Sequence, residues 1–293
     1  MKILSLIFFT MINITQSLSA QNNHKVCKEC VTVLKEALQN GETIFIKVHA
    51  AEAMIFNDYY TGISTAFNKL IKEQSNLIVA SRVLARVYQN DKAKYQSYIN
   101  ALLYQLNNAD STRGKLIALE SLAKLGFQES LPEIKLYADT GTNGFKAMAC
   151  WVLSNSNSAA DEDRLAKLLA SKEPTEYRGA AYALRFKKKI KPETLQLLTA
   201  CAKRVEKAHA AKVYVLSSWY VHAATAKTAQ ESKKKLLTYM NGAVNERYEV
   251  AESFSMRGSV KDIPVINKLM SDENMDVRVA AAKALWSISQ RKK

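Results

Sequence analysis

The chain has 293 residues, of which 48% are hydrophobic and 24% charged, a composition typical of a globular protein with one sizeable core or one extended array. Nine glycines, four prolines and four cysteines are too few for a collagen, a turn-dense β-sandwich or a disulfide-dense scaffold. The formal net charge of +15 favours anionic partners but leaves the fold undetermined.

The first 20 residues have the pattern of a secretory signal peptide. Lys2 supplies a positive start, an apolar run extends from Ile3 to Ile12, and small residues end the segment at Ala20. The run is too short to cross a bilayer, which takes about 20 apolar residues, and an N-terminal anchor that stays uncleaved is the alternative. No later segment is apolar enough to span a membrane. We therefore expect an exported protein, periplasmic or secreted, with one domain over residues 21–293.

Cys27 and Cys30 form a Cys-x-x-Cys pair in the first predicted helix. A redox role would need a βαβ pattern, which the sequence lacks, and a zinc site would need two more ligands, of which only His24 is near. In an exported protein we expect a local disulfide, or two thiols on a capping helix. Cys150 and Cys201 fall on apolar helical positions and are predicted to be buried.

One pattern then recurs along the chain. A basic residue, here named the anchor, is followed by small or apolar residues at positions +3, +4, +6 and +7, as in the last copy, where Arg278 precedes Ala281, Ala282, Ala284 and Leu285. Tyr177 takes the anchor position in one copy, and the copy near Arg82 is the weakest. The anchors, spaced 31 to 35 residues apart, are Lys47, Arg82, Lys115, Lys146, Tyr177, Lys212, Arg247 and Arg278.

The +3, +4 and +7 spacing is that of a helix. A second amphipathic helix lies between anchors, as at residues 164–169 and 194–198, so each unit is predicted to be two antiparallel helices. One such pair cannot bury its apolar stripe alone. We therefore expect an all-α fold, a right-handed α-solenoid of about eight antiparallel helix pairs. We expect it to form an open curved rod, with the segments around residues 47 and 278 far apart.

The repeated block Val277-Arg278…Ala281-Ala282…Ala284-Leu285 resembles the HEAT repeat, in the short form also known from phycobilisome-lyase-type repeats. The resemblance covers nearly all of residues 25–289. The first copy, from Lys47 to Met54, also resembles segments of secreted bacterial HEAT-repeat proteins. The resemblance implies that the anchor helices line the inner, concave face, and it is specific for the fold but weak for activity.

Position +5 after each anchor is predicted to point into the concave groove, because +3, +4 and +7 pack inward. The aromatic residues there, with Arg178 and Tyr248 at +1, suit recognition of a sugar ring, a peptide or an aromatic group. The alternative is that a tightly curved solenoid buries them as packing. The candidate binding residues are Trp151, Tyr182, Arg178, Tyr248, Glu52, Glu120 and Glu252.

No catalytic constellation, cofactor motif or metal-ligand spacing occurs in the sequence. The favoured function is therefore a non-catalytic exported scaffold, monomeric, that binds a protein or polymeric partner through the concave face. The alternative is a salt-dependent binder of a polyanion such as a sulfated glycan, anionic lipid or nucleic acid. A third reading, a lyase-type enzyme using Glu52, Glu120 and Glu252, is disfavoured because these carboxylates are spread over many units and would meet only through curvature of the fold.

Overall fold

The computed structural model describes residues 28–291 apart from 74, 143, 157–158 and 207–208. These residues are helical or lie in turns, and no strand occurs among them. The all-α prediction is confirmed. The proposed signal peptide over residues 1–20 and one of the paired cysteines, Cys27, lie outside the described residues.

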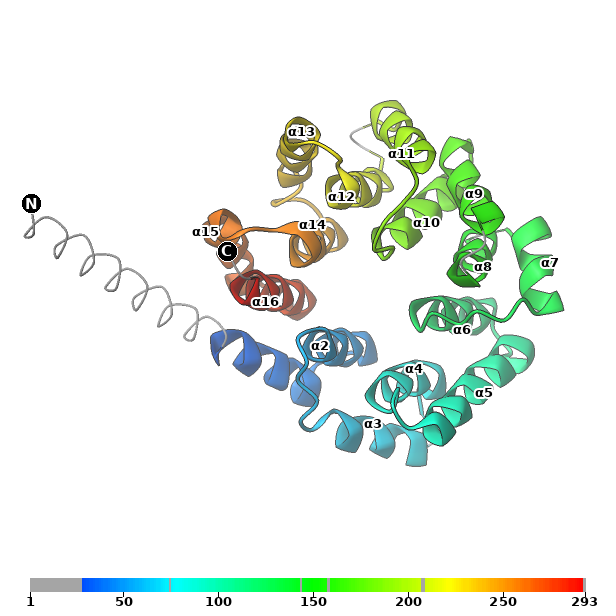
Figure 1. Ribbon diagram of the computed structural model, residues 1–293. Helices are drawn as coiled ribbons and strands as arrows, with labels where there is room; N and C mark the ends of the chain where they lie inside the picture. The colour runs from blue at the N-terminus through cyan, green and yellow to red at the C-terminus, as the bar shows by residue number, and fades with distance from the viewer. Residues whose placement is uncertain (1–27, 74, 143, 157–158, 207–208, 292–293) are drawn as a thin grey trace, which may run out of the picture.

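The helices alternate between an inner ring and an outer layer (Figure 1). A first helix spans residues 28–40. The inner helices are α2 (Ile44–Phe56), α4 (Leu77–Val87), α6 (Thr112–Lys124), α8 (Phe145–Leu153), α10 (Pro174–Arg185), α12 (Lys212–His222), α14 (Val244–Arg257) and α16 (Met275–Gln290). The outer helices are α3 (Ile63–Lys72), α5 (Lys92–Asn108), α7 (Pro132–Thr140), α9 (Ala159–Lys167), α11 (Pro192–Arg204), α13 (Ala226–Leu237) and α15 (Ile263–Ile266).

Local sequence explains where several of these helices begin. The side chains of Thr43, Ser111 and Asn274 accept hydrogen bonds from first-turn backbone amides of α2, α6 and α16. Pro174 opens α10 and Pro192 opens α11, at positions where the missing N–H would have had no helical partner. N-cap side chains and prolines in the sequence thus mark where these helices begin.

Small residues let the inner helices approach closely. Gly179 on α10 faces α8, and a Cβ atom added to it would lie 2.6 Å from the Cβ of Ala147. The helix α16 is buried over nearly its whole length because it packs against α14 on one side and α2 on the other. Cys150 and Cys201 are buried as predicted, and burial raises the pKa of Cys150 to about 12.

The anchor assigned near Arg82 is wrong by five residues. Helix α4 begins at Leu77, and the buried positions Ala80, Ser81 and Leu84 follow it at +3, +4 and +7. Arg82 therefore occupies position +5, on the side that faces the ring centre. The burial of apolar and small side chains, rather than the basic residue, sets the phase of this repeat.

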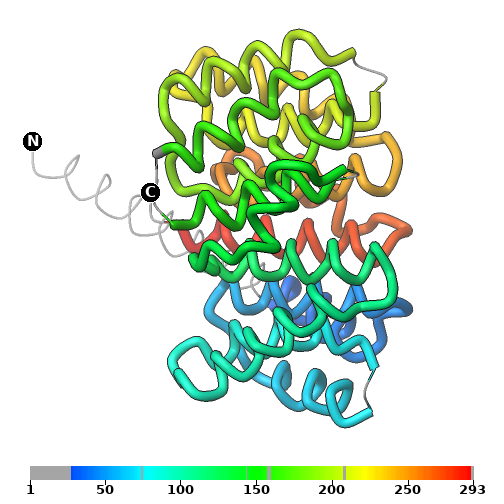
Figure 2. Tube along the Cα trace, turned by 90° about the vertical axis from the view of Figure 1, so that its right-hand side faces the viewer, coloured from blue at the N-terminus to red at the C-terminus, as the bar shows by residue number. Residues whose placement is uncertain are grey.

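The expectation of an open rod is also wrong, because the ring closes. Helix α2 packs against α16 as well as against α4, and Figures 1 and 2 both show α2 and α16 side by side. The Oγ of Ser287 lies 3.1 Å from Oδ1 of Asn57, and Nδ1 of His49 lies 2.7 Å from Oδ1 of Asp276. Segments 230 residues apart thus meet at a seam, and the concave face becomes the wall of an enclosed space.

Candidate binding cavity

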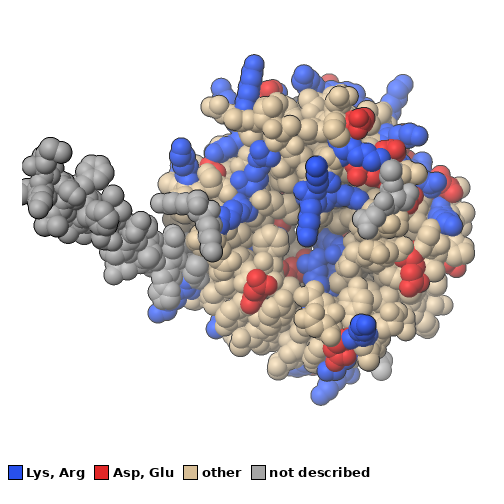
Figure 3. Space-filling model, in the orientation of Figure 1, with Lys and Arg blue, Asp and Glu red and all other residues tan. Residues whose placement is uncertain are grey.

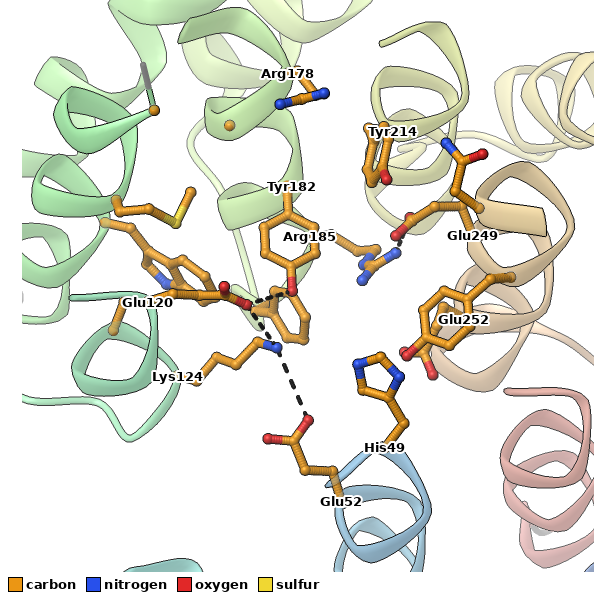
Figure 4. A pocket seen from close by; sticks show the side chains of 18 of the residues that line it. His49, Glu52, Glu120, Lys124, Arg178, Tyr182, Arg185, Tyr214, Glu249 and Glu252 are labelled. Carbon is orange, nitrogen blue, oxygen red and sulfur yellow. Dashed lines mark hydrogen bonds and ion pairs between the residues drawn. The ribbon is translucent and has the colours of Figure 1, made fainter. Parts of the chain in front are cut away.

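A cavity of about 990 Å³ lies at the centre of the ring. Every inner helix contributes at least one side chain to its wall. Figure 3 shows a hollow in the middle of one face with charged side chains inside it, and Figure 4 shows these side chains converging from opposite helices. Residues distant in sequence are therefore brought to one site by ring closure alone.

All seven candidate binding residues lie in the wall of this one cavity. Trp151 is only 2% exposed, and its ring packs edge-on against that of Tyr182 with 5.8 Å between the centroids. Trp151 is therefore buried as packing, as the alternative has it, whereas Tyr182 is half-buried and lines the cavity. Ser217, at +5 on α12, is fully buried outside the lining and contacts Arg185.

One side of the cavity is formed by α2, α4 and α6 together with Tyr182. Glu52 pairs with Arg82 at 2.9 Å and with Lys124 at 3.9 Å, and Lys124 also pairs with Glu120 at 2.9 Å. The Tyr182 hydroxyl donates to Glu120 over 3.0 Å (Figure 4). Burial alone would raise the pKa of Glu120, but Lys124 and Arg82 outweigh it and lower that pKa to about 2. The pKa of Glu52 is lowered for the same reason, so both carboxylates are charged at neutral pH.

The opposite side is formed by α10, α14 and α16. Arg185 pairs with Glu249, and Lys283 pairs with Glu252 at 2.7 Å. Burial raises the pKa of Glu249, with Glu252 adding to the effect and Arg185 opposing it. The pKa of Glu252 is lowered, because Lys283 and Arg185 outweigh its burial. Arg185 also lies over the rings of Tyr182 and Phe186, so the aromatic faces on this side already hold a cation of the protein.

Tyr182 and Tyr248, two of the tyrosines that line the wall, stay neutral. Burial raises the pKa of Tyr182 and of Tyr248 well above the usual value, and nearby carboxylates add to the shift. The ring of Tyr248 lies 5.0 Å from that of His49, which belongs to the seam. These phenols can donate or accept hydrogen bonds at all ordinary pH values.

Sequence reasoning missed the basic residues that neutralise the carboxylates. Lys124 lies four residues after Glu120, and Arg185 lies three after Tyr182, so each shares the helix face of a recognised +5 residue. The same spacing places Arg86 four residues after Arg82 in the corrected repeat. The signal was present in the sequence, as positions +8 and +9 of the pattern.

Basic side chains also gather where the inner helices end. Arg86 donates to the carbonyl oxygen of Lys124, His222 contacts that of Leu184, and Arg257 donates to that of Val221. In each case the side chain reaches the last turn of an adjacent inner helix, whose carbonyl groups have no helical partner. Lys187 and Arg291 make the same kind of contact. We name this series the carbonyl ladder, and it accounts structurally for part of the basic surplus.

The described part of the chain contains no group of three or more metal-ligating side chains, and none of its helices could cross a bilayer. Cys30 is buried in the helix over residues 28–40. The disulfide expected between it and Cys27 stays a prediction. A scan against protein-family models and a search of the curated proteins found no match to this chain.

Proposed function

We propose that this protein is a non-catalytic, exported, monomeric binding protein whose central cavity holds a short segment of a protein or polymeric partner. In this proposal the chain is a right-handed HEAT-type solenoid of about eight antiparallel helix pairs, bent until its first and last inner helices meet. The observation that carries the proposal is the convergence of all seven sequence-predicted groove residues on one cavity.

The size of the cavity limits what it holds. A volume of about 990 Å³ is at the upper end of the range for ligand pockets, roughly 300–1,000 Å³, and is far too small for a folded domain. Ring closure therefore replaces the extended docking surface expected of an open array. A partner enters only as a chain end, an exposed loop or a short polymer segment.

The charges of the wall favour binding over catalysis. Ring closure brings Glu52, Glu120 and Glu252 into one cavity, which removes the distance objection to a lyase. Each of these carboxylates is nevertheless neutralised by a lysine or arginine and has a lowered pKa, whereas a general acid needs a pKa near the working pH. A wall whose carboxylates are held in ion pairs is suited to holding a polar ligand in one orientation.

Binding of a long polyanion on the outer surface is supported less well. The sequence carries basic runs at residues 187–191 and 233–235, and both are partly engaged. Lys187 donates to the carbonyl of Ser154, Lys191 pairs with Asp163, and Lys233 pairs with Asp262. Several charges that suggest a polyanion surface therefore act within the fold.

The test uses immobilised protein and a mixture of random tetrapeptides, with retained peptides identified by mass spectrometry. We expect the wild-type protein to retain a subset of them and Thr175→Trp, which fills the cavity wall at the start of α10, to lose it. Tyr104→Ala, on the exposed face of outer helix α5, is the matched control and should behave as wild type. Equal retention by T175W would contradict the proposal, and peptides recovered in cleaved or altered form would favour the enzyme instead.

A further inference from the structure

Arg178 differs from the other cations of the cavity wall. Arg86, Lys124, Arg185 and Lys283 each donate to a carboxylate or a carbonyl of the protein. Within the described residues, Arg178 has no hydrogen bond or ion pair and lies only over the ring of Tyr214, at 6.0 Å from its centroid. It is an exposed guanidinium that faces the cavity with its donors unused (Figure 4).

The charges of the wall leave an excess of positive charge. Five cations and five carboxylates line the cavity, and Arg82 stands behind Glu52 as a sixth cation. Four of the carboxylates pair with Arg82, Lys124, Arg185 and Lys283, and the fifth, Asp276, pairs with His49. Arg86 and Arg178 therefore have no carboxylate partner, and of these two only Arg86 donates to a carbonyl. An anion bound at Arg178 would balance part of this excess.

A second free donor lies deeper on the same helix face. Arg178, Tyr182 and Arg185 occupy positions i, i+4 and i+7 of α10 and so form one stripe along the wall. Arg185 is 3% exposed, and its Nε has no hydrogen-bond acceptor in the described structure. Seven residues of helix separate the two guanidinium-bearing positions by about 10 Å along the axis. A buried N–H without an acceptor is costly, so an acceptor supplied by a ligand would be stabilising.

We propose that the cavity binds the carboxyl-terminal end of a peptide chain. The terminal carboxylate pairs with Arg178, and the preceding residues extend inward beside Tyr182 toward Arg185. An extended chain covers about 3.3 Å per residue, so three residues span the distance between the two arginines. Arg178 lies near the starts of the inner helices, where the positive ends of their dipoles also favour an anion. This inference rests on the proposed function and names the ligand of the same cavity.

The experiment compares two mixtures of random tripeptides that differ only in the terminus, one with free carboxylates and one with carboxamides. Affinity is measured on the immobilised protein, by competition between the free acids and the carboxamides. We expect the free acids to bind about tenfold or more tightly than the amides, because a guanidinium–carboxylate pair is a charge-assisted bond. Arg178→Ala should abolish this preference without changing the melting temperature, since the side chain is exposed. Arg178→Lys should keep part of it, and Arg113→Ala, an exposed arginine outside the cavity wall, should leave it intact.

The outcomes separate this inference from the proposed function. Equal binding of acids and amides by the wild-type protein would overturn the assignment of Arg178 while leaving the cavity a binding site. A preference for acids that survives in R178A would overturn it as well, because the carboxylate would then lie elsewhere. Binding of neither mixture would count against both proposals. Competition by inorganic phosphate far stronger than by acetate would contradict the assignment of Arg178 to a carboxylate.

Discussion

The inner ring and the outer layer hold ion pairs of the same length in very different surroundings. Lys283 and Glu252 lie 2.7 Å apart on the inner ring with their side chains 10% and 6% exposed, whereas Arg164 and Asp139 lie 2.7 Å apart on the outer layer at 43% and 60%. The exposed outer pair contributes little to the free energy of folding, because solvent screens the attraction between its charges. The inner carboxylate, deprived of water, depends on its partner. Equal distances therefore describe two unequal roles, and the inner pairs hold the ring's wall in one arrangement.

The largest expected difference comes from removing one partner of each pair. Lys283→Ala should lower the free energy of unfolding by about 3–5 kcal/mol, because it leaves Glu252 buried without its main counter-charge. Arg164→Ala should lower it by less than about 1 kcal/mol. Urea denaturation followed by circular dichroism measures both.

The double variant Lys283→Met with Glu252→Leu sharpens this prediction. It should recover most of the lost stability, since no buried charge is left without a partner. If K283A and R164A destabilised the protein equally, the distinction between the two layers would not stand.

The next effect concerns the loss of stability at low pH. Glu120 has its pKa lowered from 4.5 to about 2 in the folded protein, so its stabilising contribution is complete above pH 4.5 and is lost as the pH falls toward 2. Glu120→Gln should therefore cost up to about 3 kcal/mol at pH 7 and only about 0.4 kcal/mol at pH 2. Thermal melts of the wild-type protein and E120Q from pH 2 to 7 test this. If the melting temperatures of the two proteins differed by the same amount at every pH, the ionised Glu120 would not be stabilising.

The smallest effect concerns the carbonyl ladder. Arg257→Ala should lower the free energy of unfolding by about 1–2 kcal/mol, because the Val221 carbonyl at the end of α12 loses a charged donor. Lys234→Ala, on outer helix α13, removes an exposed charge and should change stability by less than about 0.5 kcal/mol. Indistinguishable melting temperatures would mean that the ladder is not a source of stability.

Much of the inner ring could be predicted from the sequence, and its closure could not. Helical spacing alone predicts the +5 positions. Six of their occupants reach the cavity wall and Ser217 does not; the six are Glu52, Glu120, Trp151, Tyr182, Glu252 and Lys283. Near Arg82 the basic residue predicts the wrong phase, because the buried Ala80, Ser81 and Leu84 set the register of α4.

Closure depends on the small rotation between successive pairs, summed over the whole chain. That rotation is set by side-chain packing at each interface, such as the close approach of Gly179 to Ala147, and not by the repeat spacing. Nothing in the sequence around His49 or around Asp276 predicts that these two residues pair, because the contact depends on ring closure.

The seam between α2 and α16 has a consequence for how such a chain can change over time. In a stack with two free ends, one more repeat lengthens the molecule and one fewer shortens it, and either outcome still folds. Here both neighbours of every inner helix are already fixed, so adding or deleting a single repeat would leave a gap or a clash at the junction. A change in the number of repeats would therefore have to re-form the junction between α2 and α16, whereas changes in side chains and outer loops leave it in place.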